Sequence, residues 1–261
     1  MKFSGKVAIV TGSSSGIGQA TALLLAQEGA SVVIHGRSKE KLLATEKLLC
    51  EHKIPSNRVL TIQGEVQDDK CQEDLIEKTI AKFGKLDVLV NNAGLGGDPG
   101  LQMQSMDQYD YLQDVNVKSV IKLSNLALPH LEKTKGNIVN VSSLASFHPA
   151  DNFLYYAMSK AALDHFTRSR AENLAKKGIR INCVNPGYIK TQFLNQLNLP
   201  KDYQETYTEA YENKIPLGRS GVPMDIAKTI SFLASDDAGY VTGVCLIADG
   251  GLHAKSNLVS Q

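Results

Sequence analysis

Short runs rich in β-branched residues alternate with longer segments of helical periodicity along this chain of 261 residues, and this alternation constrains its fold most. The periodicity is clear in residues 17–28, where Ile17, Ala20 and Leu24 lie on one helix face and polar residues on the other. Strand and helix repeated in this order predict right-handed crossovers and a parallel sheet covered on both faces. We therefore expect a three-layer, doubly wound α/β fold.

Seven strand-like runs are separated by six amphipathic segments. The expected strands are Val7–Thr11, Ser31–His35, Arg58–Gln63, Val88–Asn91, Asn137–Ser142, Arg180–Val184 and Val244–Ile247. The expected helices are Ile17–Glu28, Lys39–His52, Asp69–Phe83, Asp107–Leu131, Tyr155–Lys176 and Met224–Ser235. This pattern is typical of a Rossmann-type sheet, and without a linker, a repeat or a composition break it predicts one domain over residues 1–261. The irregular stretch 191–216 is expected to be a lid over the ligand crevice.

Charge and cysteine usage indicate the kind of partner and the compartment. Lys and Arg total 28 and Asp and Glu 27, without a basic stripe or an acidic tail, so we expect no nucleic acid and no membrane as partner. The chain starts without a signal-peptide pattern, and no apolar run approaches the roughly 18 residues of a spanning helix. The four cysteines are isolated and lack metal-ligand spacing, which predicts reduced thiols, a cytoplasmic protein and no metal site. They are Cys50, Cys71, Cys183 and Cys245.

A glycine-rich turn, TGSSSGIG at residues 11–18, ends the first expected strand and opens the first expected helix. Glycines let the backbone turn tightly and approach a pyrophosphate, while the helix N-terminus supplies N–H groups and the positive end of a dipole. The spacing is GxxxGxG rather than GxGxxG, and no Lys-Ser/Thr pair follows, which excludes a P-loop kinase. The strand-then-helix setting predicts a dinucleotide site that includes Gly12, Ser14, Ser15, Gly16, Ile17 and Gly18.

The end of the second expected strand predicts which dinucleotide is bound. An NAD enzyme carries an acid about twenty residues after the turn, where it binds the ribose 2′-hydroxyl. This chain has Gly36, which leaves room, followed by Arg37 and Lys39, whose charges attract a 2′-phosphate. We therefore expect NADP(H) rather than NAD(H), bound by Arg37 and Ser38. The alternative is that Arg37 and Lys39 only face solvent at a helix start.

Tyr156 and Lys160 are four residues apart, so they share one face of an expected helix. A free tyrosine has a pKa of about 10 and is a slow acid or base at neutral pH. A nearby cation favours the phenolate and lowers that pKa. Taken alone the pair is common by chance, and a solvated lysine on an amphipathic helix explains it as well.

Six stretches in a fixed order favour the catalytic interpretation of Tyr156 and Lys160 over a solvated lysine. They are TGSSSGIG at 11–18, NNAG at 91–94, Asn116, the serine pair at 142–143, YAMSK at 156–160 and NPGYIKT at 185–191. Together they resemble the short-chain dehydrogenase/reductase family, in its single-domain branch, over nearly the whole chain. The stretches GRSKEKL and YYAMSKAA look like those of animal NADP-dependent carbonyl reductase-like members. The resemblance implies hydride transfer between a nicotinamide cofactor and a carbonyl or alcohol.

The resemblance implies four catalytic residues. Tyr156 is the general acid in carbonyl reduction and the base in alcohol oxidation. Lys160 lowers the pKa of Tyr156 and holds the nicotinamide ribose. Ser143 hydrogen-bonds the substrate oxygen, and Ser142 is the competing choice. Asn116 holds a water that relays protons to Lys160.

It also implies cofactor contacts in two loops that follow strands. The first loop lies beside the adenine ribose, and the second holds the carboxamide of the nicotinamide. The residues are Asn92, Ala93, Gly94, Pro186, Gly187, Ile189 and Thr191.

Two positions depart from the family pattern. After the third strand the family carries Asp-Val to hold the adenine amino group, and this chain has Glu65 and Val66, of which Glu65 is one methylene longer. Many NADP-preferring members carry a basic residue where this chain has Ser15. Binding of the 2′-phosphate is therefore expected to depend on Arg37.

The sequence therefore predicts an NADP(H)-dependent carbonyl reductase. Its substrate contacts are expected to be Ser143, Leu144, Tyr156, Tyr188 and Phe193. Two alternatives are an NAD-linked alcohol, sterol or sugar dehydrogenase and a catalytically silent dinucleotide-binding protein. The second would be favoured by an incomplete Asn/Ser/Tyr/Lys set, and here the set is complete.

Assembly is expected as well, because long helices after the fourth and fifth strands pair across two-fold axes in this family. The expected helices 107–131 and 155–176 carry more apolar residues than one sheet face needs, and we expect a homotetramer or a homodimer. Examples are Leu123, Leu126, Leu128 and Phe166.

Overall fold

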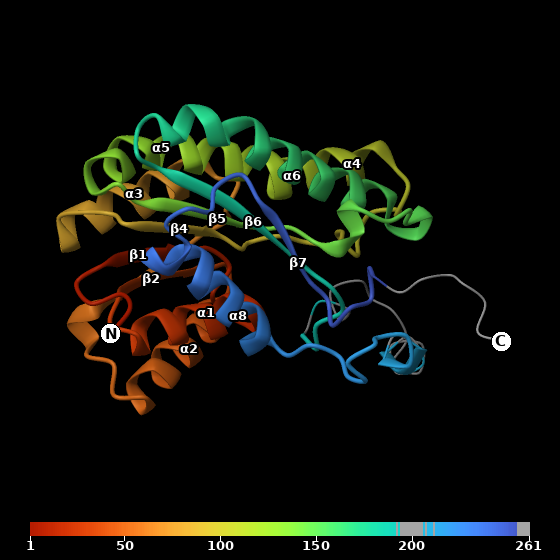
Figure 1. The fold of residues 1–261 in the computed structure, drawn as a ribbon, viewed down its shortest axis with the longest axis horizontal. Coiled ribbons are helices and arrows are strands. Elements are labelled where there is room, and N and C mark those ends of the chain that lie inside the picture. Colours follow the sequence, from red (N-terminus) through yellow and green to blue (C-terminus); the bar gives the residue numbers. More distant parts are fainter. Residues whose placement is uncertain (192, 194–205, 207, 211, 255–261) are drawn as a thin grey trace.

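The computed structural model describes residues 1–191, 193, 206, 208–210 and 212–254, and these contain one sheet of seven parallel strands (Figure 1). The strands are β1 Val7–Val10, β2 Ser31–Gly36, β3 Val59–Gln63, β4 Val88–Asn91, β5 Asn137–Val141, β6 Arg180–Pro186 and β7 Cys245–Ala248. Their order is β3-β2-β1-β4-β5-β6-β7, so the strand order reverses between β1 and β4, where open α/β sheets bind ligands. All seven expected strands are confirmed, with ends that differ by two residues or fewer.

Helices cover both faces of this sheet, which confirms the three-layer, doubly wound fold (Figure 1). One layer contains α1 Gly16–Gln27, α2 Lys39–Glu51 and α8 Pro223–Ala234. The other contains α3 Asp69–Phe83, α4 Met106–Gln113, α5 Ser119–Thr134 and α6 Leu154–Ala175.

Each face of the sheet has its own apolar core, because successive side chains of a strand point to opposite faces. Val10 and Val90 pack in the core with α1 and α8. Ile9 and Leu89 pack in the core on the α3 and α5 side. Burial on both faces explains why these strands are short, continuous apolar runs.

The expected helix over 107–131 is confirmed as one helical run from Met106 to Thr134, but it is not α-helical throughout. Helices α4 and α5 are joined by a π-helical turn at Asp114–Lys118, which contains the fully buried Asn116. The Oδ1 of Asn116 accepts from the backbone N–H of Leu95, and its Nδ2 donates to the Leu95 carbonyl, both at 2.9 Å. These bonds hold the turn against the loop after β4. They join residues that are distant in the sequence, so the helical periodicity of the segment does not predict the π-helical turn.

The four apolar residues expected to mediate assembly differ in their burial. Leu123 is fully buried against the sheet together with Ala127 and Leu131, which follow at intervals of four residues, so the expectation for Leu123 is wrong. Leu128 and Phe166 are half-buried beside the same core, whereas Leu126 is 41% exposed.

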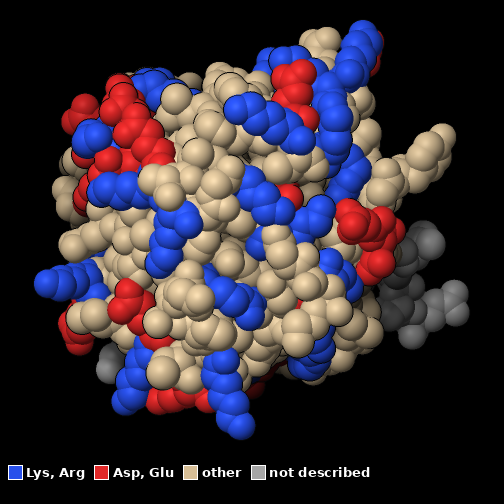
Figure 2. Space-filling view, turned by 90° about the vertical axis from the view of Figure 1, so that its left-hand side faces the viewer, with Lys and Arg blue, Asp and Glu red and all other residues tan. Residues whose placement is uncertain are grey.

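The left-hand face of the molecule in Figure 1 is turned to the viewer in Figure 2. Lys and Arg side chains are interspersed there with Asp and Glu side chains. A nucleic-acid site is instead marked by a continuous basic patch. Among the helices within the described ranges, none is long and apolar enough to cross a membrane.

Candidate active site

A cavity of about 580 Å³ lies along the carboxyl ends of the strands. It brings together most of the residues predicted from the sequence. Many of them come from the loops after β1, β4, β5 and β6, which contain the sequence motifs, and from α6. The predicted residues that line the cavity are Gly12, Ser14, Ser15, Gly16, Ile17, Arg37, Val66, Asn92, Ala93, Gly94, Ser143, Leu144, Tyr156, Lys160, Pro186, Gly187, Tyr188, Ile189, Thr191 and Phe193.

Four predicted residues do not line the cavity. Asn116 lies beneath it in the π-helical turn. Gly18 packs below the glycine-rich turn, where a Cβ would lie 2.4 Å from the Gly12 carbonyl oxygen. Ser38 caps α2 by accepting from the Lys41 N–H at 3.3 Å. Glu65 is exposed and accepts from the Gln67 side chain at 2.5 Å.

Several lining residues were not assigned from the sequence. Gln67 lines the cavity beside Val66, in the place expected for Glu65, and a polar residue after the third strand was the available signal. Lys214 and Leu252 also line it. They come from segments near the C-terminus, and no motif in the sequence marks them.

The glycine-rich turn presents an uncapped helix N-terminus to the cavity. Gly12 and Gly16 have φ values of +64° and +56°, a left-handed conformation that glycine adopts without strain. Ser15 precedes α1 and makes no side-chain capping bond, and the first turn of α1 contains no acidic residue. The N–H groups there are therefore arranged for an anionic group such as a pyrophosphate.

The loop after β4 holds this turn in place. The Nδ2 of Asn92 donates to the carbonyls of Thr11 and Gly12 at 2.9 and 3.1 Å, and the backbone N–H of Ala93 donates to the Thr11 hydroxyl at 3.0 Å. The NNAG motif thus supports the glycine-rich turn through direct hydrogen bonds.

Gly36 was expected to leave room for a 2′-phosphate, but the side chain of Ser14 lies beside it. A Cβ at Gly36 would lie 2.8 Å from both Cβ and Oγ of Ser14. The glycine is therefore needed for the close approach of the first turn, and the side chain of Ser14 occupies the room beside it. The exposed Arg37 follows and lines the cavity.

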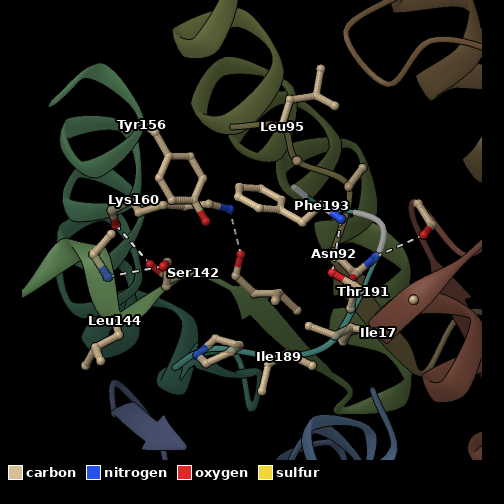
Figure 3. A pocket seen from close by; sticks show the side chains of 18 of the residues that line it. Ile17, Asn92, Leu95, Ser142, Leu144, Tyr156, Lys160, Ile189, Thr191 and Phe193 are labelled. Carbon is tan, nitrogen blue, oxygen red and sulfur yellow. Dashed lines mark hydrogen bonds between the residues drawn. The ribbon is translucent and has the colours of Figure 1, made fainter. Parts of the chain in front are cut away.

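Tyr156 and Lys160 project from α6 into the cavity (Figure 3). Ser143, which also lines the cavity, follows β5. Lys160 is 4% exposed, and its Nζ donates to the Val141 carbonyl at 3.0 Å and lies 5.7 Å from the centroid of the Tyr156 ring. The hydroxyl of Ser142 donates to the Lys160 carbonyl at 3.1 Å, whereas Ser143 is hydrogen-bonded to Tyr156. The geometry therefore favours Ser143 over Ser142 as the partner of the tyrosine.

Burial controls both titratable groups of this cluster. It raises the pKa of Tyr156 to about 12, against the hydrogen bond with Ser143, which lowers it. It lowers the pKa of Lys160 to about 8. At neutral pH the tyrosine therefore holds a proton that it can donate, and the lysine carries a positive charge.

Two aromatic side chains that line the cavity, Tyr188 and Phe193, each contact a neighbouring side chain. The Phe193 ring lies 5.5 Å from the Tyr156 ring (Figure 3), and the Tyr188 hydroxyl lies 2.6 Å from the Thr208 hydroxyl. Most of the predicted lid at 191–216, including Leu194 and Leu197, lies outside the described residues.

His35 supports the first turn from below. It is the last but one residue of β2 and is 1% exposed, and its Nδ1 accepts from the Gly12 N–H at 3.2 Å. Burial lowers the pKa of His35 to about 4. The ring is therefore neutral at physiological pH.

This histidine predicts a specific loss of stability in acid. Between about pH 6.5 and 4 the unfolded chain protonates the residue and the folded chain does not, so the free energy of unfolding falls as pH falls. Relative to His35→Asn, whose amide oxygen can accept the same bond, wild type should lose up to about 3 kcal/mol over this window. Urea unfolding of both proteins at pH 7 and pH 4.5 measures it. Equal losses in the two proteins would contradict a buried neutral imidazole.

Comparison with known proteins agrees with this geometry. The family model for enoyl-(acyl carrier protein) reductase matches residues 12–253. The 3-oxoacyl-(acyl-carrier-protein) reductase of Thermotoga maritima is 40% identical over 97% of this chain and 99% of its own. A Caenorhabditis elegans short-chain dehydrogenase/reductase of unknown function, solved with cofactor, is 40% identical, with a TM-score of 0.94 over 98% of both chains. The apo glucose dehydrogenase of Caenorhabditis elegans is also 40% identical, with a TM-score of 0.87 over 98% of this chain and 100% of that one. The chain therefore belongs to the short-chain dehydrogenase/reductase family, whose members are oxidoreductases that act on CH–OH and C=O groups with a nicotinamide cofactor.

Proposed function

We propose that this protein is an NADP(H)-dependent carbonyl reductase. One observation carries the proposal: a single cavity contains Arg37 after β2 and the cluster of Ser143, Tyr156 and Lys160 after β5. In the sheet, β1 and β4 lie between β2 and β5, and the glycine-rich turn follows β1. In this order the glycine-rich turn lies between Arg37 and Tyr156, which supports the binding of a dinucleotide beside its substrate.

The residues present fit a dinucleotide. The uncapped N-terminus of α1 suits the pyrophosphate. A Cβ at Gly94 would lie 3.1 Å from the Lys160 Nζ and 3.2 Å from the Asn116 Oδ1, so this glycine keeps open the space in front of both polar groups. We propose that Lys160 holds the nicotinamide ribose there, and that Ile189 and Thr191 hold the carboxamide.

The bound cofactor supplies a hydride for the carbonyl carbon of the substrate. Tyr156 donates the proton to the carbonyl oxygen, which its raised pKa allows at neutral pH. The hydroxyl of Ser143 donates a hydrogen bond to the same oxygen and stabilises the charge that develops on it. The charged Lys160 then favours the phenolate of Tyr156 until the proton is replaced.

We propose that Asn116 has a positioning role and that it also holds the water that relays protons to Lys160. Both protons of its amide group are used within the protein, by the Leu95 carbonyl and by the hydroxyl of Ser159 at 3.0 Å. A water that relays protons would therefore be bound through an oxygen of Asn116. Leu144, Tyr188 and Phe193 are proposed to form the apolar wall for the substrate. We also propose that the chain is one domain and that the segment 191–216 is the lid of its site.

A sugar or alcohol dehydrogenase is the second candidate, because the glucose dehydrogenase of Caenorhabditis elegans is similar over the whole chain. The two functions differ in the preferred direction and cofactor. NADPH consumption over a panel of ketones, diketones, quinones and steroids, beside NAD reduction with alcohols, sterols and glucose, separates them. Turnover of only the second set would reject the carbonyl reductase.

We propose that the protein is cytoplasmic. We also propose that it assembles into a homotetramer or a homodimer through its long helices. Leu126, Leu154 and Met158 are 41%, 43% and 44% exposed on α5 and α6, and such apolar surface is typical of an interface. Light scattering at micromolar concentration should give the mass of four copies of the 28.3 kDa chain, or of two. A single species of 28.3 kDa would contradict it.

A further inference from the structure

Cys183 and Cys245 are distant in the sequence and adjacent in the sheet. They are register partners on the neighbouring parallel strands β6 and β7, so their side chains point to the same face. Their Sγ atoms and a carboxylate oxygen of Asp164 on α6 all lie within 4.8 Å of one another. Neighbouring strands are about 4.8 Å apart, which falls within the Cα separations that disulfides span. The two thiols are therefore placed to form a bond.

The two thiols have different surroundings. Cys245 is half-buried, and the Nη1 of Arg168 lies 3.5 Å from its Sγ. The hydrogen bond with Cys183 lowers the pKa of Cys245, and the charge of Arg168 adds to this. Cys183 is fully buried, and burial raises its pKa. Cys245 is thus the nucleophilic thiol, because the thiolate is the reactive form.

Asp164 connects this pair to the active site. The Sγ of Cys183 donates to its Oδ1 at 3.4 Å. The carboxylate is 2% exposed and also accepts from the Asn185 Nδ2, at 3.0 and 2.9 Å, and from the Ser146 hydroxyl at 2.7 Å. The same two side chains lie 3.2 and 2.7 Å from the carbonyl oxygen of Ser143. A shift of Asp164 would therefore move the backbone that carries Ser143.

We propose that Cys245 and Cys183 form a peroxide-oxidisable thiol pair, whose disulfide alters the active site through Asp164. The thiolate of Cys245 attacks hydrogen peroxide, so that an S–O bond forms and the O–O bond breaks; hydroxide leaves and takes up the proton that the Cys245 thiol released. Cys183 then attacks the sulfenic acid. The S–S bond forms, the S–O bond breaks, and water leaves with the proton of Cys183. Both sulfurs are oxidised, and the peroxide is reduced to two molecules of water.

A metal ion is the competing occupant of this cluster. Cys183, Cys245 and Asp164 offer two sulfurs and an oxygen, which suit zinc. However, the oxygens of Asp164 already accept from three side chains, and the guanidinium of Arg168 lies beside Cys245. A cation would have to displace these donors, so oxidation is the chemistry that fits the arrangement.

The test uses the full-length protein with Cys50→Ser, because Cys50 is an exposed thiol that could cross-link molecules. Reduced protein is treated with hydrogen peroxide, denatured, alkylated and mapped by mass spectrometry. We expect the loss of two alkylatable thiols, a peptide pair joined through Cys183 and Cys245, and full recovery with dithiothreitol. Cys245→Ser should leave Cys183 alkylatable. Cys183→Ser should leave a sulfenic acid on Cys245 that dimedone captures.

Three outcomes would overturn the pair. They are two thiols that stay alkylatable in peroxide, a cross-link that involves the buried Cys71 instead, and one zinc ion per chain that is retained on dialysis and lost in Cys183→Ser. The thiol count does not depend on turnover, so its failure is distinct from failure of the proposed function.

A second experiment, which rests on the proposed function, measures whether the disulfide lowers turnover through Asp164. Hydrogen bonds to a charged group contribute about 1.5–3 kcal/mol, so a displaced Asp164 should lower kcat roughly tenfold or more. The loss should be reversed by dithiothreitol and absent in the double variant Cys183→Ser/Cys245→Ser. Equal inactivation of the double variant, or a mapped disulfide with unchanged kcat, would overturn the coupling to the active site.

Discussion

Replacing Tyr156 with phenylalanine is expected to lower kcat for carbonyl reduction by about 10²–10⁴-fold, the usual contribution of general acid catalysis. The hydroxyl is the proton donor, and burial, which raises its pKa to about 12, keeps it protonated at neutral pH. The ring stays, with its contact to Phe193 at 5.5 Å, so the wall of the cavity is retained. Dinucleotide binding, measured by fluorescence titration, should therefore be preserved while turnover is lost.

Tyr155 provides the matched control for this substitution. Its hydroxyl donates to the Gln104 carbonyl at 3.2 Å, and its ring packs against Tyr109 at 5.3 Å, away from the substrate chemistry. Tyr155→Phe should keep kcat near the wild-type value. Near-normal turnover in Tyr156→Phe, or an equal loss in Tyr155→Phe, would remove the proton-transfer step proposed for Tyr156.

The layered fold could be predicted because local periodicity and motif order determine it. Strands buried on both faces are continuous apolar runs, and all seven were found. The π-helical turn was not predictable in this way. It depends on the bonds between Asn116 and the Leu95 backbone, which join two segments distant in the sequence. The prediction for Leu123 was wrong for the same reason, because the burial of this residue depends on the orientation of α5 after that turn.

Within the site, motif residues were predictable and their neighbours were not. TGSSSGIG, NNAG and YAMSK each have a fixed place after a strand or on a helix, so their residues meet in one cavity. Glu65 was assigned by analogy, but Gln67 lines the cavity, because the direction of the chain after β3 is set by tertiary packing. Cys183 and Cys245 were interpreted as isolated thiols, and only the register of β6 and β7 places them together.

Cofactor choice should depend on few atoms, and Arg37→Ala is expected to remove most of a roughly ten- to hundredfold preference for NADPH over NADH. A 2′-phosphate carries close to two negative charges and needs charge-assisted donors, and the guanidinium can bind it in a bidentate manner. One such contact contributes about 1.5–3 kcal/mol, which corresponds to that preference. The exposed position of Arg37 on the cavity wall is consistent with this role. Arg37→Lys, which keeps the charge without the fork of donors, should retain part of the preference.

The reverse change requires a second substitution. Gly36→Asp would introduce the acid that binds ribose hydroxyls and repels a 2′-phosphate, and it should favour NADH. Its Cβ would lie 2.8 Å from the Cβ and Oγ of Ser14, and the next neighbour, Leu42, is 3.6 Å away. Ser14→Gly removes both close atoms, so the double variant Ser14→Gly/Gly36→Asp should reverse the preference without strain, and Ser14→Gly alone serves as its control. The measurement is kcat/KM for NADPH and NADH at low and high salt, because screening weakens the contribution of Arg37. If wild type used NADH as well as NADPH at low salt, Arg37 would only face solvent, and the assignment of NADP(H) would be wrong.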